Sequence, residues 1–513
     1  MYINPNSDIK LLHNVPLDNT YEHTIYFNTD TEQYNYFSKY VKKSFSNQSY
    51  LRVNKGVARM DVKADDIYDC NYMMFRNTAY GSKWFYAFIT SIEYVNDNCT
   101  NVTFEIDVMQ TWFFVHNVDK CFVEREHPVS DQIGEHYEPE NIDTGEYVFN
   151  DYRNLDPAFS PMAVVVMVSD VSESPDGELY NGIYGGCTLY AFNSTDSETI
   201  TTFLSHYDQA PEAVVSIYML PTICIEQPLK NGEKTRLYKS DVCKYRTVTV
   251  QTLTDSTFID GYTPKCKKLY TYPYNFYYVN TGTQSAVYRY ELFDDLLPQF
   301  RIDTPVTYPV QILMRPMYYK GCKDTPLNSE GITLTNYPLC SWRTDAFRAW
   351  LAQNSLPIAT TAISSGLSIG LGATGMIPLS DTKNNMNKAS NLLMQGYQAS
   401  IKADITRGNI YSGSVEISSK SKGFYGGRCS ITSEYAKMID DYFNMYGYAV
   451  KRVKHPNFSS RPHWNYVKTV GCCLTGSVPA DDMKKLCSIY DNGITFWKNG
   501  DEIGDYSLDN SPV

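Results

Sequence analysis

The stretch between Arg348 and Asp381 contains no charged residue. It is rich in Ala, Gly, Ser, Thr and Ile, and it includes Pro357 and Pro378. About 20 mainly apolar helical residues cross a bilayer core, so this uncharged run is long enough to span one. Its prolines and glycines disfavour a permanent transmembrane helix. Because a lasting exposure of such a run would promote aggregation, we expect it to be sheltered until it meets a membrane.

The alternative interpretation of the uncharged run is a buried hairpin in a soluble core. Core segments usually carry Leu, Val and Phe at a regular period, whereas small residues predominate here without one. Small residues permit close packing in lipid, and glycine permits rearrangement of the backbone. The composition therefore favours a membrane-active segment similar to those of fusion and pore-forming proteins.

The 513-residue chain otherwise has the composition of an ordinary folded protein, with 43% hydrophobic and 20% charged residues. Its bias is aromatic: 44 Tyr and 23 Phe favour strands and large packed surfaces. We therefore predict a mainly β (α+β) fold, with a few helices and a long apolar loop. The formal net charge of −12 argues against tight binding of nucleic acid, although a channel that passes DNA should avoid adhering to it.

Cysteine usage and the first residues indicate where the protein is made. The thirteen cysteines are scattered and include no CxxC pair, so we expect reduced and mostly buried thiols. The opening MYINPNSDIK lacks the apolar stretch of a secretory signal. Both observations predict synthesis and assembly in a cytoplasm.

Strand patterns are clearest in the first third of the chain. Aromatic and aliphatic residues alternate loosely with smaller ones from Trp84 to Val95, and Val102 to Val108 alternate with polar residues. Asn96–Asn98 supply a turn between them, so the pattern predicts a hairpin. Further strands are predicted in the runs Ala163–Val168, Lys244–Leu253 and Val306–Met314.

Three helices are predicted in the last third. Apolar residues recur every four positions from Ala389 to Ile405, directly after the uncharged run. A second amphipathic pattern spans Tyr435–Met445, with Thr432 or Ser433 as N-cap and Gly447 as terminator. A third helix is predicted over Pro479–Tyr490, with Ser477 as a possible cap and acidic residues in its first turn, followed by a strand over Ile494–Trp497.

Composition changes divide the chain into four predicted segments. Residues 1–127 form an N-terminal β lobe, and an acidic, loop-like stretch then opens a central β-rich region over 128–342. Residues 343–410 hold the uncharged run and its following helix. Residues 411–513 form a C-terminal lobe that completes the first one.

Two catalytic signatures occur inside the uncharged run. Gly366, Ser368 and Gly370 match the hydrolase G-x-S-x-G elbow, and Gly370, Gly372 and Gly375 match the G-x-G-x-x-G phosphate loop. The first needs a strand, turn and helix around the serine, and the second needs a preceding strand and a later acidic residue. Neither setting is present, so both matches follow from the small-residue composition and predict no catalytic residue.

No metal or cofactor site is predicted. The eight histidines form no HExxH motif, and no Cys/His group has zinc spacing. A divalent ion between His127 and His136, which flank the acidic loop, is the one alternative left open. A basic cluster with interleaved aromatics stands out against the acidic background and predicts a subunit interface, a solvated face near acidic neighbours, or a sparse lining of a DNA path. Its members are Lys451, Arg452, Lys454, Arg461 and Lys468.

Long strings at both ends of the chain resemble one protein family. They include NYMMFRNTAYGSKWFYAFITSIEYVN, VTFEIDVMQTWFF and FVEREH near the N-terminus, and FNMYGYAVKRVKHPN, RPHWNYVKT and IYDNGITFW near the C-terminus. They are similar to the tail knob (distal tail tube) proteins of small short-tailed bacteriophages with picovirus-type morphology. The resemblance covers roughly residues 1–127 and 343–513.

The resemblance implies a homo-hexameric, β-rich tube at the tail tip of a virion, without enzymatic activity or cofactor. Implied partners are other tail proteins of the lower collar or proximal tube, host membrane lipid, and double-stranded DNA that passes without sequence-specific binding. In such a tube the apolar loops plug the channel and later form a pore in the host membrane. The residues expected to insert are Leu351, Leu356, Ile358, Ile363, Leu367, Ile369, Leu371, Met376, Ile377 and Leu379.

Two other functions remain open from the sequence. A tail-associated enzyme that degrades cell wall would need two carboxylates at the right spacing in space, which an abundance of Asp and Glu neither shows nor excludes. A receptor-binding adhesin is the other alternative, and competition for cell binding would test it.

Overall fold

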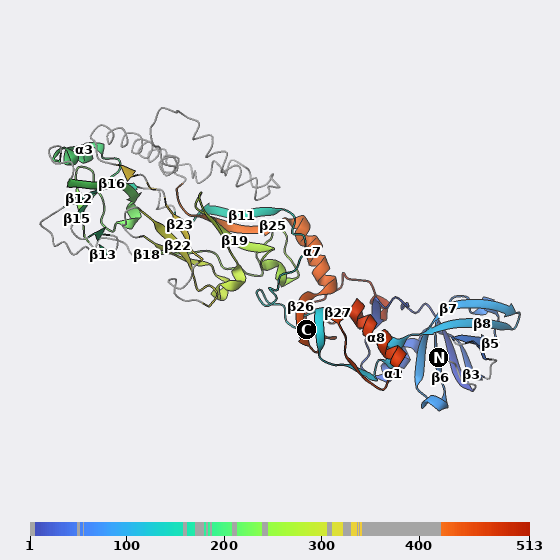
Figure 1. The fold of residues 1–513 in the computed structure, drawn as a ribbon. Helices are drawn as coiled ribbons and strands as arrows, with labels where there is room; N and C mark the ends of the chain where they lie inside the picture. Colours follow the sequence, from blue (N-terminus) through green and yellow to red (C-terminus); the bar gives the residue numbers. More distant parts are fainter. Residues whose placement is uncertain are drawn as a thin grey trace. The chain divides into compact units, whose positions relative to one another are not determined.

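The fold is mainly β, which confirms the prediction from composition. The computed structural model describes residues 6–48, 52–54, 56–156, 162–169, 179–180, 183–184, 187–207, 213–238, 245–304, 310–321, 330–335, 337, 339–340 and 422–512. The chain divides into two compact units (Figure 1). Unit 1 comprises Met1–Gln132, Glu138–Glu140 and Ile439–Val513, and unit 2 comprises Ile133–Tyr137 and Asn141–Met438.

Unit 1 contains an antiparallel seven-stranded sheet in the order β3-β1-β6-β7-β8-β5-β4. Its strands are β1 (Ser7–His13), β3 (Val41–Gln48), β4 (Arg52–Asn54), β5 (Val57–Met60), β6 (Cys70–Arg76), β7 (Trp84–Asn96) and β8 (Cys99–Ile106). Strands β7 and β8 form the hairpin that the sequence pattern predicted, so this prediction is confirmed. Val108 is not on the strand as predicted, because the Asp107 carboxylate caps helix α2 (Val108–Trp112) by accepting from Gln110 N at 3.0 Å.

A second, five-stranded sheet of unit 1 joins distant parts of the chain in the order β2-β29-β27-β10-β26. Its strands are β2 (His23–Ile25), β10 (Cys121–Glu126), β26 (Tyr448–Lys454), β27 (Trp464–Val470) and β29 (Ile494–Trp497). Strands β2 and β29 pair parallel, and the other neighbours pair antiparallel. A short ladder joins β9 (His116–Val118) to β28 (Leu474–Gly476).

The core of unit 1 contains residues from both ends of the chain. Phe37 of helix α1 (Asp30–Ser38) stacks on Tyr72 of β6 with ring centroids 5.2 Å apart, and both side chains are fully buried. Leu486 and Tyr490 of helix α8 (Ala480–Asn492) belong to the same core. Each buried large apolar side chain contributes about 1.5–3 kcal/mol. The two chain ends are therefore held together mainly by apolar burial.

The two helices predicted in the described part of the last third are present. Helix α7 (Ser433–Tyr446) matches the second pattern, and Gly447, at φ 65°, ends it. Helix α8 matches the third, with Asp481 and Asp482 in its first turn, and β29 follows as predicted. The proposed cap Ser477 is wrong, because Pro479 occupies the N-cap and no side chain caps the helix. The helix predicted over Ala389–Ile405 lies outside the described residues.

Unit 2 contains three larger antiparallel sheets. The first has the order β11-β25-β19-β20, the second β17-β15-β12-β16-β24 and the third β18-β21-β22-β23. The first comprises β11 (Tyr147–Asn154), β19 (Asn275–Asn280), β20 (Ser285–Tyr288) and β25 (Tyr425–Ile431). The second comprises β12 (Met162–Ser169), β15 (Cys187–Asn193), β16 (Val214–Pro221), β17 (Thr235–Leu237) and β24 (Leu339–Cys340). The third comprises β18 (Tyr245–Thr249), β21 (Gln299–Asp303), β22 (Ile312–Met317) and β23 (Ile332–Leu334).

Smaller elements complete unit 2, and its strands test the central predictions. A two-residue ladder joins β13 (Leu179–Tyr180) to β14 (Ile183–Tyr184), and helix α3 spans Ser197–Ser205. The strand predicted at Ala163–Val168 is β12, whose side chains are almost all buried. The other two predicted runs overlap β18, which ends at Thr249 before the predicted Leu253, and β22, which begins at Ile312 and continues past the predicted Met314 to Met317. Part of the third run, residues 306–309, lies outside the described residues.

Candidate functional site

The ten residues expected to enter a membrane, from Leu351 to Leu379, all lie outside the described residues, as do the two motifs built on Ser368 and Gly370. Within the part of the chain that the structure describes, no helix is both long and apolar enough to cross a bilayer. The membrane-active segment therefore stays a prediction from sequence, and the geometry of the described residues concerns the surfaces of the two units.

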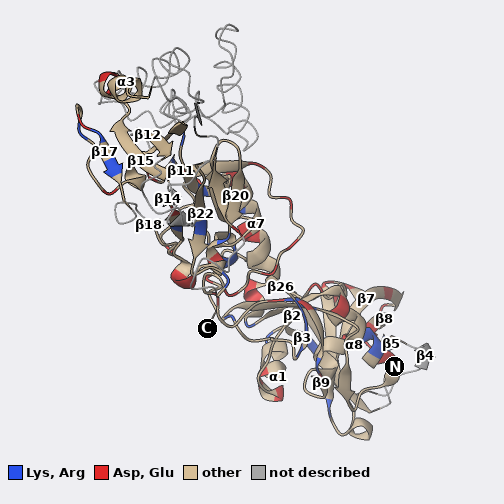
Figure 2. Cartoon of the chain, turned by 60° about the vertical axis from the view of Figure 1, so that its left-hand side comes forward, with Lys and Arg blue, Asp and Glu red and all other residues tan. Residues whose placement is uncertain are grey.

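The structure distributes the basic cluster over β26, β27 and the loop that joins them. Lys454 donates to the buried carboxylate of Glu126, and Lys468 pairs with Glu124 at 2.9 Å. Lys451 and Arg452 are exposed on β26. Neither has an ion-pair partner among the described residues. Charged residues of both signs are interspersed along both units in Figure 2. Two of the five members are thus paired with carboxylates, and the exposed cations without an ion-pair partner in the described part of the chain lie on the edge strand β26.

Arg461 has a different environment, because it is only 4% exposed in unit 1. Its Nη1 donates to the carbonyl of Asn444 at 3.0 Å. The same carbonyl accepts from Nε2 of the fully buried His127, whose Nδ1 accepts from Tyr466 N at 2.7 Å. Arg461 and His127 therefore tie the end of α7 to β27.

Both ring nitrogens of His127 are thus used inside the protein, one as donor and one as acceptor, which requires a neutral ring. Burial lowers the pKa of His127 well below its usual value, and the positive charges of Arg461 and Arg125 lower it further. The Nε2–H bond to Asn444 acts in the opposite direction and is outweighed. His127 therefore cannot also bind a divalent ion together with His136, and the alternative metal site left open by the sequence is wrong at this residue.

Unit 1 should lose stability as the pH falls below about 6.5, where an unfolded histidine gains a proton that buried His127 resists. Above that pH the ring is neutral in both the folded and the unfolded state. Below it the free energy of unfolding falls by an amount that approaches about 1.4 kcal/mol per pH unit. Burial raises the pKa of Asp107 to about 6, so the folded state takes up this proton first and the effect opposes that of His127 below about pH 6.

The measurement is the urea midpoint of unfolding at pH 7.5 and 6.0 for the native chain and for His127→Gln. Glutamine offers one acceptor and one donor but does not titrate, while Asp107 is retained in both proteins. A drop in midpoint that is equally large in the variant would contradict this role of His127.

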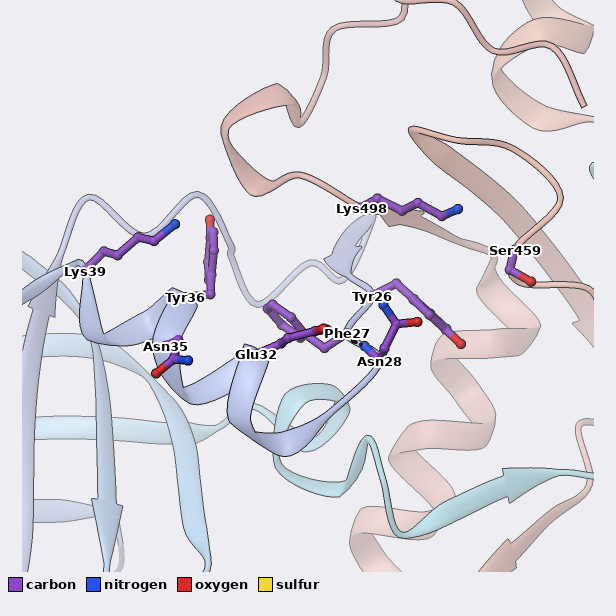
Figure 3. A pocket seen from close by; sticks show the side chains of 9 residues that line it. All are labelled: Tyr26, Phe27, Asn28, Glu32, Asn35, Tyr36, Lys39, Ser459 and Lys498. Atoms are coloured by element: carbon purple, nitrogen blue, oxygen red, sulfur yellow. Dashed lines mark hydrogen bonds between the residues drawn. The ribbon is translucent and has the colours of Figure 1, made fainter. Parts of the chain in front are cut away.

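A cavity of about 490 Å³ lies on unit 1 beside helix α1 (Figure 3). Its lining includes the rings of Phe27 and Tyr36, whose centroids are 5.6 Å apart, and the two lysines Lys39 and Lys498. Nζ of Lys39 is 5.8 Å from the centroid of the Tyr36 ring. Glu32 is engaged by the backbone N–H of Asn28 at 3.0 Å. The lining residues are Tyr26, Phe27, Asn28, Glu32, Asn35, Tyr36, Lys39, Ser459 and Lys498.

This cavity has no catalytic arrangement, because its lining contains no histidine to act as base for Ser459. Its lysines, amides and rings fit an anionic group or a hydroxyl-bearing one equally well, so they select no ligand class. No pattern in the sequence indicated this cavity, because its residues come from three separate segments.

Thiol and carboxylate groups form no metal centre within the described ranges, where no three His, Cys, Asp or Glu side chains are placed to share an ion. Among the described cysteines, free thiols are found at Cys70, Cys99, Cys121, Cys187, Cys429, Cys472, Cys473 and Cys487. Burial raises the pKa of Cys70 to about 11 and that of Cys429 to about 12, which keeps both thiols protonated and unreactive.

Comparison with known proteins identifies first the class and then the family. Residues 5–117 match the family model of the caudoviral major tail protein N-terminus, so this part of unit 1 is similar to tail proteins of tailed bacteriophages. Residues 236–511 match the model of the C-terminal domain of tail knob protein gp9 of Bacillus phage phi29. Because this second match spans more than half of the chain, the chain belongs to the gp9 tail knob family. The resemblance seen in the sequence is thereby confirmed.

Full-length relatives agree with this assignment. The chain is 27% identical to tail knob protein gp9 of Bacillus phage B103 and 26% identical to that of phi29, over 98% of this chain and of each relative. The solved structure of the bacteriophage C1 tail knob protein gp12 superimposes with a TM-score of 0.63, covering 99% of this chain and all of that one. Its sequence identity is 16%, so this likeness concerns the fold.

Proposed function

We propose that this tail knob protein forms a homo-hexameric conduit at the virion tail tip, through which the genome leaves. In this proposal residues 1–127 and 411–513 build the tube lobe, and residues 128–342 form a second region of unassigned role. The apolar loop within 343–410 plugs the channel before infection and then opens a pore in the host membrane. The uncharged run from Ala349 to Ser380 is the observation that carries the proposal.

Membrane insertion of the run would be driven by apolar burial, at about 25 cal/mol per Å² removed from water. A charged residue near the bilayer centre costs about 2.5–3.5 kcal/mol, and this run contains none. Membership of the tail knob family supports a position in the tail. In that position the protein would contact other tail proteins and the host membrane. Assembly in the host cytoplasm accords with reduced thiols.

The conduit must let DNA slide, and the ion pairs within the basic cluster agree with this requirement. Lys454 and Lys468 each have a carboxylate partner, which leaves few free cations to hold phosphates. A negatively charged protein with sparse cations would repel the duplex enough to prevent arrest. DNA is accordingly proposed as cargo and not as a specific ligand.

Release of a dye from liposomes tests the pore directly. We expect the native protein to cause leakage, and a chain lacking Leu351–Leu379 to cause at least tenfold less, because the apolar surface that partitions into lipid is gone. Leu367→Asp should reduce leakage strongly, since it places a charge inside the run. Asn385→Asp, which adds the same charge outside it, is the matched control.

Folding of the variants is checked by far-ultraviolet circular dichroism and by the mass of the assembled particle. Equal leakage by the native chain and the folded deletion variant would overturn the pore. The alternatives, a cell-wall enzyme and an adhesin, are tested on the same protein by a zymogram on purified cell wall and by competition for cell binding. Clearing that disappears when one carboxylate is replaced would establish the enzyme instead.

A further inference from the structure

The five-stranded sheet of unit 1 carries an exposed apolar strip that crosses three strands. In the register of the sheet, Phe122 of β10 lies opposite Val453 of β26 on one side and opposite Val470 of β27 on the other. Residues directly opposite each other in antiparallel strands project to the same face. The three side chains are 38%, 66% and 52% exposed, respectively. We call Phe122, Val453 and Val470 the apolar strip.

The strip lies beside free positive charge at an open sheet edge. Strand β26 is the last strand of its sheet, so one side of its backbone is unpaired within the sheet. Lys451 and Arg452 precede Val453, are exposed, and have no ion-pair partner among the described residues. Arg452 lies opposite the fully buried Val123, so its side chain starts from the other face of this edge strand. Lys451 has φ 47°, a strained conformation for a residue with a side chain, which interrupts the regular edge. An apolar strip next to unpaired cations is typical of a protein interface and not of a solvated face.

A second exposed surface of unit 1 has the opposite charge. The hairpin of β7 and β8 ends in a two-residue turn after Asn96. Near this end Tyr94 is 64% exposed and Val95 is 37% exposed. Glu93 and Asp97 are exposed beside them, and the Tyr94 hydroxyl donates to Asp97 at 2.8 Å. We call Glu93–Asp97 the hairpin tip.

We propose that the hairpin tip of one copy of this chain packs on the apolar strip of a neighbouring copy. Tyr94 and Val95 would cover the strip, and Glu93 and Asp97 would pair with Lys451 and, around the open edge of β26, with Arg452. This inference rests on the proposed homo-oligomer and specifies the contact that closes it.

Charge determines which surfaces of two copies meet. A strip facing a second strip would bring the free cations together, and a tip facing a second tip would bring carboxylates together; both arrangements are repulsive. Only tip to strip joins opposite charges as well as apolar surfaces. Both surfaces are exposed in the same molecule, so a chain does not cover its own strip with its own tip. A contact between two different patches is heterologous, and repeated around a rotation axis it closes a ring.

Charge reversal in pairs tests this contact in the full chain. One variant carries Glu93→Lys and Asp97→Lys, a second carries Lys451→Glu and Arg452→Glu, and a third carries all four substitutions. We expect each of the first two to raise the dissociation constant between subunits by about tenfold or more, because like charges then face each other. The third should recover assembly, because the charges are again opposite.

Sedimentation equilibrium gives the particle masses, and circular dichroism confirms folding. For the apolar part, Val453→Asp should disrupt assembly, whereas Val129→Asp, at a residue 62% exposed in unit 1 but outside both surfaces, should not. A native chain that stays monomeric, folded charge variants that assemble normally, or a four-fold variant that fails to recover would each overturn the contact. Native rings that cause no dye leakage would instead overturn the pore and leave the contact intact.

Discussion

Replacing Glu140 by Gln is expected to lower the free energy of unfolding of unit 1 by about 3–5 kcal/mol, because it leaves Arg125 buried without a negative partner. The Arg125 side chain is 11% exposed and that of Glu140 is 4% exposed. Arg125 Nη1 donates to Glu140, and Nη2 donates to the carbonyl of Gly447 at 2.6 Å. The other Glu140 oxygen accepts from Ala449 N at 3.0 Å. The pair therefore joins β10 to the end of α7 and the start of β26.

Glu124→Gln is the matched control, because Glu124 lies on β10 next to Arg125. Glu124 pairs with Lys468, but both side chains are about one-third exposed, so the loss should be at most about 1 kcal/mol. Unfolding in urea is followed by tryptophan fluorescence, since Trp84, Trp112, Trp464 and Trp497 lie in unit 1. In a double variant, Arg125→Met should add little to the loss caused by Glu140→Gln. Equal losses for Glu140→Gln and Glu124→Gln would show that burial does not strengthen the pair.

Local periodicity predicted the local elements well. The alternation in β7 and β8 and the apolar spacing of α7 and α8 each come from contiguous residues, which is why the hairpin and both helices were found. The predicted ends of strands and helices were less accurate where a single side chain determines the end. Strand β8 ends before Asp107, because the Asp107 side chain caps helix α2. An alternation of apolar residues carries no information about that hydrogen bond.

The C-terminal segment was predicted to complete the N-terminal lobe, but which residues of distant segments pair was beyond sequence reasoning. Strand β2 pairs with β29 across nearly the whole chain, and Glu140 meets Arg125 through a loop that looked merely acidic. For the same reason Arg461 and Lys451 appeared equivalent in the basic cluster, although one is buried against Asn444 and the other is exposed. Phe122 and Val470 resemble core residues in the sequence, and only the sheet register shows them on an open face.

Replacing Gly427 by Ala should disrupt the first sheet of unit 2, where β25 lies between β11 and β19. A Cβ atom at this position would lie 1.7 Å from the carbonyl oxygen of Asp151 and 2.6 Å from Cα of Tyr152. These are backbone atoms, which cannot move away by a change of rotamer. The register of β11 is irregular between Phe149 and Asp151, which lets its backbone approach β25 this closely.

We expect Gly427→Ala to cost about 3 kcal/mol or more, since the strands must separate or lose hydrogen bonds to accept the methyl group. Hydrogen exchange followed by mass spectrometry should show faster exchange in peptides that cover β11, β19 and β25. Gly423→Ala is the control, because its nearest neighbour is the flexible side-chain amide of Asn154 at 3.3 Å, and exchange should change little. If both variants exchange as slowly as the native protein, the close packing of β25 on β11 is wrong; if only Gly427→Ala exchanges faster, the glycine is required by this strand contact.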